Sequence, residues 1–341
     1  MYYKIILFSS ILLFINFFLI KFKLLVDDPN ESFHKIEKLS GTPLSGGIYI
    51  FFCIVLISFL DFVAYFKINF SIFLILILIL GIFSDLKKNF SPKLRIIFQL
   101  FIIISLVLIN KEILINKTNI EILDVLLKNQ SGKFLFTIFC IITLLNGLNF
   151  MDGVNGLVTG YIFLILSILN LIMLKSTNNY YYIDLTLIYA VFFIFNIFGK
   201  SFLGDNGIYI SAILVSFLII NILNVDRSIS PIIAVSLLWY PAIENLFTIL
   251  RRKFKKKFSY LPDKLHLHAL IFKKLELHFR FIPHKYKNSL TGLIIIFFLI
   301  PNFTLTYLFY DKSYQLGYLV VVYIFIYLLS YILLSKNKSK M

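Results

Sequence analysis

The chain has 341 residues, of which 60% are hydrophobic and only 15% are charged, and its mean hydropathy is +0.90. Soluble globular proteins average about half apolar and about a quarter charged residues, so this composition excludes a soluble protein and predicts a polytopic membrane protein. The formal net charge is +16. Because the cations lie between apolar segments, they are typical of cytosolic loops beside anionic membrane lipids and argue against nucleic acid as a partner.

Eleven apolar segments approach the roughly 20 residues that a helix needs to cross a bilayer. In chain order they cover residues 4–22, 46–66, 68–84, 94–110, 133–150, 154–174, 180–198, 207–224, 230–250, 290–309 and 315–335. The first has no small-residue cleavage site, which predicts a retained span rather than a signal peptide. Together they predict an all-α fold with about 11 transmembrane helices in a single integral-membrane domain, residues 1–341, whose longest loop is the basic segment 251–289.

The distribution of lysine and arginine predicts the orientation. With the N-terminus outside and the C-terminus in the cytosol, the predicted cytosolic segments hold 24 of the 33 lysine and arginine residues. This bias follows the positive-inside rule. The same orientation places four polar junctions between apolar segments on the cytosolic side.

The most informative junction is NGLNFMDGVNGL at 146–157. Asn146, Asn149 and Asp152 are three residues apart and would share one face of a helix, and Asn155 extends the series by three more. Unsatisfied polar groups in hydrocarbon cost several kcal/mol each. This polar cluster at the end of a membrane span therefore predicts a functional site. The alternative is that the polar side chains hydrogen-bond between neighbouring helices. Three glycines permit close helix approach, or a break that frees backbone N–H groups for an anion: Gly147, Gly153 and Gly156.

Two further carboxylates lie at predicted cytosolic junctions. Asp85 ends the third apolar segment, and Asp205 lies in a glycine-flanked turn before the eighth. Taken alone, Asp85 could be a helix cap and Asp205 part of an ordinary turn. Taken together with Asp152, they suit Mg²⁺, which binds through one or two carboxylates plus substrate phosphates. The pattern therefore predicts phosphoryl transfer at the membrane surface, where catalysis is mostly positioning and charge neutralisation.

Cationic side chains near these junctions are candidate phosphate ligands, with solvated or snorkelling cations as the alternative. They are Lys35, Lys38, Arg251 and Arg252. His266 and His268 follow in the basic loop, two residues apart. No third histidine or cysteine lies close to them, so a zinc site is disfavoured and hydrogen-bond donation to phosphate is favoured.

These motifs resemble the polyprenyl-phosphate N-acetylhexosamine-1-phosphate transferases, in the superfamily of glycosyltransferase family 4 and the phospho-muramoyl-pentapeptide transferases. The resemblance covers nearly the whole chain, in TPLSGG, SDLKKNFSPKLRIIFQ, NGLNFMDGVNGL, FLGDNG and PDKLHLH. It implies transfer of GlcNAc-1-phosphate, or a related sugar 1-phosphate, from a UDP-N-acetylhexosamine to undecaprenyl phosphate. UMP would be released, and the product would initiate a cell-envelope glycan at the cytoplasmic face of a bacterial plasma membrane. Mg²⁺, or alternatively Mn²⁺, would be the cofactor.

The resemblance also implies roles for the polar residues. Asp205 would be the main metal ligand, and Asp152 would also bind metal and, with Asn149, serve the nucleotide and pyrophosphate end. Asp85 would serve the lipid phosphate or the metal. Phe202 would stack on uracil. The implied ligands of the diphosphate are His266 and His268.

The chain departs from the family pattern at Ser84, Asn155 and Glu244, where aspartate is usual, and at Ala269, where histidine is usual. Ser84 bears on the mechanism, because the usual acidic pair has been assigned the deprotonation of the lipid phosphate. A phosphate monoester has a second pKa near 6, so it is already largely dianionic at neutral pH. Metal and orientation can then suffice without a strong base.

Four alternatives stay open at this stage. The peptidoglycan branch of the family transfers phospho-N-acetylmuramoyl-pentapeptide, but it typically has a run of three histidines where this chain has two. A transporter of lipid-linked sugars would show charged pathways deep in the bilayer and internal symmetry. Ser84 also allows an inactive homologue. The oligomeric state is open, with a homodimer as one alternative.

Overall fold

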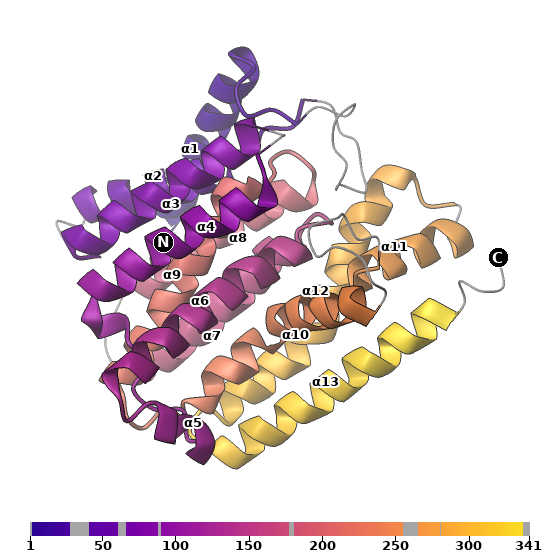
Figure 1. Cartoon of the computed structure of the whole chain (residues 1–341). Helices are drawn as coiled ribbons and strands as arrows, with labels where there is room; N and C mark the ends of the chain where they lie inside the picture. Colours follow the sequence, from indigo (N-terminus) through magenta and orange to yellow (C-terminus); the bar gives the residue numbers. More distant parts are fainter. Residues whose placement is uncertain are drawn as a thin grey trace.

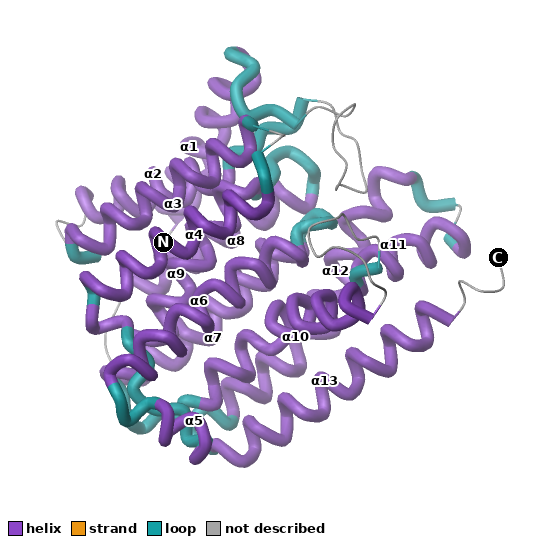
Figure 2. Tube along the Cα trace, in the orientation of Figure 1, coloured by secondary structure: helices purple, strands orange, loops and turns teal. Residues whose placement is uncertain are grey.

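Figure 1 shows the computed structural model of the chain, in which regular secondary structure is helical throughout the described residues (Figure 2). The structure describes residues 2–27, 41–60, 66–87, 90–176, 181–254, 265–279 and 281–336. The helices are α1 (Tyr2–Lys21), α2 (Gly46–Leu60), α3 (Ile68–Leu86), α4 (Pro92–Ile109), α5 (Glu121–Leu126), α6 (Gln130–Met151), α7 (Leu157–Ser176), α8 (Tyr181–Ile197), α9 (Gly204–Val225), α10 (Ile232–Phe254), α11 (Leu267–His278), α12 (His284–Leu308) and α13 (Ser313–Lys336), with a short 3₁₀ turn at Lys111–Ile113.

Every apolar segment predicted from the sequence coincides with one of these helices. Eight helices in the described part of the chain are long and apolar enough to cross a membrane, and α2, α7 and α8 contain shorter apolar helices of 10–17 residues. The polytopic, all-helical character is therefore supported, whereas the count of eleven spans is not confirmed. Helices α5 and α11 lie within segments that were expected to be loops.

Helix α9 is the centre of the bundle. Nearly all of its side chains are buried, and it packs against α2, α3, α6 and α7. By contrast, large apolar side chains on α1, α4 and α13 are exposed, which is the expected surface for contact with lipid. Glycines bring neighbouring backbones close to α9, since a Cβ at Gly47 or Gly81 would overlap the backbone of Asn206.

Short helices mark the ends of the bundle, and an ion pair joins two of its long helices. Helices α5 and α11 lie at opposite ends (Figure 1). Asp184, in the first turn of α8, is buried and pairs with Lys4 of α1 across 2.7 Å. This contact links the first turns of α1 and α8.

The orientation leads to a labelling prediction. A membrane-impermeant thiol reagent applied to intact cells should label Lys117→Cys, before α5, and should not label Lys273→Cys on α11; both positions are exposed. The parent protein is the control, since Cys53 is buried and Cys140 is half-buried within helices. Labelling of Lys273→Cys from outside would invert the orientation and remove access of this end to cytosolic nucleotide sugars.

Candidate active site

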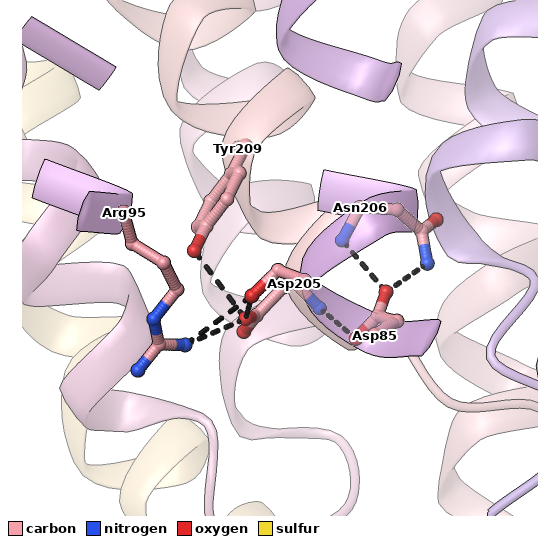
Figure 3. Close-up of polar contacts among 6 residues, drawn as sticks. Asp85, Arg95, Asp205, Asn206 and Tyr209 are labelled. Carbon is pink, nitrogen blue, oxygen red and sulfur yellow. Dashed lines mark hydrogen bonds and ion pairs between the residues drawn. The ribbon is translucent and has the colours of Figure 1, made fainter. Parts of the chain in front are cut away.

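Asp85, at the end of α3, caps the N-terminus of α9. Its carboxylate accepts hydrogen bonds from the backbone N–H groups of Asp205 (2.9 Å) and Asn206 (3.0 Å) and from the side-chain amide of Asn206 (2.5 Å) (Figure 3). The first N–H groups of a helix lack partners within the helix, and a negative charge is favourable there. Asp85 is therefore a helix cap, which is one of the two roles predicted for it from the sequence. It caps α9, however, and not its own helix.

Asp205, in the first turn of α9, has one oxygen held by three donors. Its Oδ2 accepts from the hydroxyl of Ser84 (2.5 Å), the guanidinium of Arg95 (2.9 Å) and the hydroxyl of Tyr209 (3.3 Å) (Figure 3). Among the described residues, no hydrogen-bond donor contacts its other oxygen, Oδ1. Because the Asp205 side chain is 19% exposed, Oδ1 is suited to bind a cation from the aqueous side.

The TPLSGG turn holds the loop that precedes α9. The N–H of Phe202 donates to the carbonyl of Pro43 (2.9 Å), and the N–H of Gly46 donates to the carbonyl of Phe202 (3.3 Å). The side-chain oxygen of Asn206 accepts from the N–H of Gly47 (2.6 Å). Gly204 has φ +69°, a left-handed conformation that glycine adopts without strain. Two motifs that are far apart in sequence are thereby joined at the start of α9.

Phe202 lies in the loop just before α9. Its side chain is 4% exposed and packs in a small hydrophobic cluster with Leu19, Leu25 and Leu44. Phe202 also lines a pocket together with Asp152. Its predicted stacking on uracil therefore stays a prediction.

The helix that carries the NGLNFMDGVNGL motif ends within it. α6 stops at Met151, and Asp152 is its C-terminal cap residue. The predicted shared face is therefore limited to Asn146 and Asn149, both half-buried, and Asn155 does not continue it. Asn146 donates to the carbonyl of Ile142 in its own helix (2.8 Å).

Two backbone N–H groups in the turn after α6 are bound by side chains and are not free for an anion. The N–H of Asn155 donates to the side chain of Asn288 (2.6 Å), and that of Gly156 donates to the side chain of Asn196 (2.7 Å). Gly156 has φ +81°, consistent with the predicted break. Gly147 allows the predicted close approach, since a Cβ there would overlap the backbone of Pro241 in α10.

A pocket joins this turn to the loop before α9. It is lined by Asp152, Gly153, Val154, Asn155, Asn196, Phe202, Leu203 and Asn288. Leu203, in its wall, precedes Asp205 by two residues in the sequence. Asn155 and Asn288 are buried, whereas Asp152 is half-buried.

The two histidines form a stack at the same turn. The rings of His266 and His268 lie parallel, with centroids 5.4 Å apart, and Phe150 stacks on His266 with centroids 5.6 Å apart. The guanidinium of Arg252 lies 5.5 Å from the centroid of the Phe150 ring. A Cβ on Gly153 would overlap Nε2 of His268, so the absence of a side chain there makes room for the stack.

Glu244, buried in α10, orients the histidine segment. Its carboxylate contacts Nδ1 of His266 (3.1 Å) and accepts from the N–H of Leu267 (3.3 Å). Burial, together with the neighbouring His266, lowers the pKa of His268 to about 3, against the opposing charge of Glu244. His268 is therefore neutral at physiological pH and can donate one N–H hydrogen bond.

The other basic residues predicted to bind phosphate include Arg251, Lys35 and Lys38. Arg251 is buried and donates to the carbonyl of Leu265 (2.8 Å) and the hydroxyl of Tyr331 (3.0 Å), so it fastens α10 to the histidine segment and to α13. Its predicted role as a phosphate ligand is not supported. Lys35 and Lys38 lie outside the described residues.

The predicted metal ligands, Asp205 and Asp152, stay a prediction. Within the part of the chain that the structure describes, no group of three or more His, Cys, Asp or Glu residues could hold a metal ion. Asp152 and Asp205 are therefore not ligands in a protein-only cluster. The open oxygen of Asp205 does fit Mg²⁺, which commonly uses one or two carboxylates and takes its other ligands from water and substrate phosphates.

Sequence reasoning missed the partners that hold Asp205. Arg95 lies in the first turn of α4, inside the SDLKKNFSPKLRIIFQ motif, and forms an ion pair with Asp205. Tyr209 is four residues after Asp205 and so shares its helix face. That spacing was a usable signal for Tyr209, whereas no spacing in the sequence connects Arg95 to Asp205.

Comparison with known proteins shows which proteins this chain resembles. Residues 67–223 match the glycosyl transferase family 4. The probable undecaprenyl-phosphate N-acetylglucosaminyl 1-phosphate transferase of Bacillus subtilis (strain 168) is 25% identical over 201 residues, which are 57% of this chain and 54% of that protein. The chain thus spans about half the length of the curated relative that it matches. The matched residues 67–223, which contain Asp85, Asp152 and Asp205, are thus similar to the glycosyl transferase family 4.

Proposed function

We propose that this protein is a membrane enzyme that transfers GlcNAc-1-phosphate, or a related N-acetylhexosamine 1-phosphate, from a UDP-sugar to undecaprenyl phosphate. The observation that carries this proposal is the start of α9, where Asp205 keeps one free oxygen beside a pocket lined by Asp152. The name of the Bacillus subtilis relative supports the lipid acceptor and the sugar. The reaction would take place at the cytosolic face of a bacterial plasma membrane.

In the reaction, a phosphate oxygen of the lipid attacks the phosphorus that bears the sugar. A new P–O bond forms, the bond to the UMP oxygen breaks, and UMP leaves with the electron pair. A bound Mg²⁺ would supply charge neutralisation for the phosphates. Asp205 would hold the cation through Oδ1, and Asp85 would keep the start of α9 in place.

The other residues would bind and orient the substrates. Asp152 and Asn149 would contact the nucleotide and pyrophosphate end, since Asp152 lines the pocket and Asn149 precedes it on the last turn of α6. His266 and His268 would donate N–H hydrogen bonds to the diphosphate. In the first cytosolic segment, Lys35 and Lys38 stay predicted phosphate ligands.

The direct test uses purified protein, undecaprenyl phosphate, Mg²⁺ and UDP-GlcNAc labelled in the sugar. We expect label to enter the lipid phase with release of one UMP for each sugar transferred, and EDTA to stop the reaction. Turnover with UDP-MurNAc-pentapeptide alone would instead assign the peptidoglycan reaction. Movement of a preformed lipid-linked sugar across vesicles, with no UMP formed from any UDP-sugar, would contradict an enzyme and favour a transporter.

A further inference from the structure

We propose that Ser84 is a positioning residue for Asp205, whose hydroxyl holds Oδ2 so that Oδ1 alone faces the divalent cation. This inference rests on the proposed function, which supplies the cation. Ser84 is buried, and its Oγ lies 2.5 Å from Oδ2 of Asp205. It also lies 3.4 Å from the guanidinium of Arg95, which contacts the same oxygen of Asp205. The hydroxyl thus belongs to the set of donors that fixes this carboxylate.

Ser84 and Asp85 hold two different parts of the same residue. Asp85 accepts from the backbone N–H of Asp205, while Ser84 donates to its side chain. Both come from the last turn of α3, which can approach α9 closely because Gly81 has no Cβ to overlap Asn206. One helix end therefore fixes both the backbone and the carboxylate of Asp205.

A neutral donor suits this position better than a carboxylate. The Ser84 oxygen lies within hydrogen-bond distance of Oδ2, and two carboxylates at such a distance repel each other unless they share a proton or a cation. An aspartate at position 84 would also compete with Asp205 for the single guanidinium of Arg95. With serine, the charge of Arg95 is directed to Asp205 alone. The hydroxyl of Ser84 therefore orients the carboxylate of Asp205, and this role does not require an acidic side chain at position 84.

The first test measures metal binding in the absence of substrate. Binding of Mn²⁺ to the purified full-length protein in detergent can be followed from the electron paramagnetic resonance signal of free Mn²⁺. Loss of a hydrogen bond to a metal ligand typically lowers metal affinity about 10- to 100-fold, so we expect Ser84→Ala to weaken Mn²⁺ binding by about tenfold or more. Ser84→Thr keeps the hydroxyl and should stay within about threefold of the parent.

The matched control is Ser216→Ala, a buried serine on α9 remote from Asp205 in sequence, which should leave Mn²⁺ affinity unchanged. Parent-like affinity in Ser84→Ala, or an equal loss in Ser84→Thr, would overturn the positioning role. Transfer of sugar phosphate with unchanged Mn²⁺ affinity in Ser84→Ala would contradict this inference alone. Mn²⁺ binding that depends on Ser84, without turnover of any UDP-sugar, would contradict only the proposed function.

Ser84→Asp tests the competing role of an essential base. If the lipid phosphate acts as its own dianion, this substitution should slow the initial rate, because it removes the hydroxyl that holds Asp205 and adds negative charge where an anionic nucleophile approaches. Rates of both proteins should be compared from pH 5.5 to 8.5 at saturating Mg²⁺. A tenfold or larger gain, equivalent to about 1.4 kcal/mol of barrier, would show that a second carboxylate is needed and that serine weakens the enzyme.

Discussion

Asp205→Asn is expected to abolish sugar-phosphate transfer while the protein stays folded in the membrane. Asparagine has nearly the same shape, and its carbonyl can still accept from Ser84 and Arg95, so the packing at the start of α9 is retained. The substitution replaces Oδ1, the oxygen without a protein donor, by a neutral NH₂ group that cannot bind a cation. Loss of about 4 kcal/mol of charge stabilisation corresponds to roughly a thousandfold lower rate.

The measurement is the initial rate over a range of Mg²⁺ concentrations, together with the thermal unfolding temperature in detergent. Asp226→Asn is the matched control, because Asp226 caps the other end of α9 and, in the described structure, its carboxylate accepts hydrogen bonds from the nearby Ser228 alone. It should retain transfer. Parent-level activity of Asp205→Asn with the same Mg²⁺ dependence would rule out Asp205 as the metal ligand.

The membrane helices could be predicted because continuous apolar length is a local property of the chain. Each predicted segment overlaps a helix, and the ends differ by a few residues. The short helix α11 was missed because its 12 residues are interrupted by lysines and histidine and lie in a basic segment. Its fold depends on packing against α12 and α13, which the local sequence does not contain.

The site could be predicted as a set of motifs but not as a set of contacts. Asp85 and Asp205 were selected for their charge at span ends, yet the capping of α9 by Asp85 depends on which helices are neighbours. The same applies to Phe202 and Arg251, whose residue types suited ligand binding but whose surroundings bury them. Burial is decided by segments far away in sequence, so these two assignments required the structure.

The structure adds a requirement for glycine at position 153, and Gly153→Ala is expected to lower transfer about 100-fold. The new Cβ would overlap Nε2 of His268. His268 cannot yield easily, because its ring is buried and stacks on His266, which is held in turn by Phe150 and Glu244. The added methyl group would therefore displace both His266 and His268. A shift of about 1 Å in a positioned group can lower the rate about 100-fold.

The effect should appear in the rate at saturating Mg²⁺ with little change in the yield of folded protein. Gly317→Ala is the matched control, since a Cβ at this position of α13 meets open space. It should keep full activity and gain up to about 1 kcal/mol of stability from the better helix propensity of alanine. Parent-level activity of Gly153→Ala would show that the histidine pair is not part of the reacting site.

A double-mutant cycle identifies the route by which Gly153→Ala acts. If the added methyl works only by displacing His268, then Gly153→Ala should cause little further loss in a His268→Ala protein, because the ring that it would overlap is gone. The two losses would then be strongly non-additive, as expected for residues in direct contact. Fully additive losses would mean that the methyl acts on the adjoining Asp152 and the pocket, and not through His268.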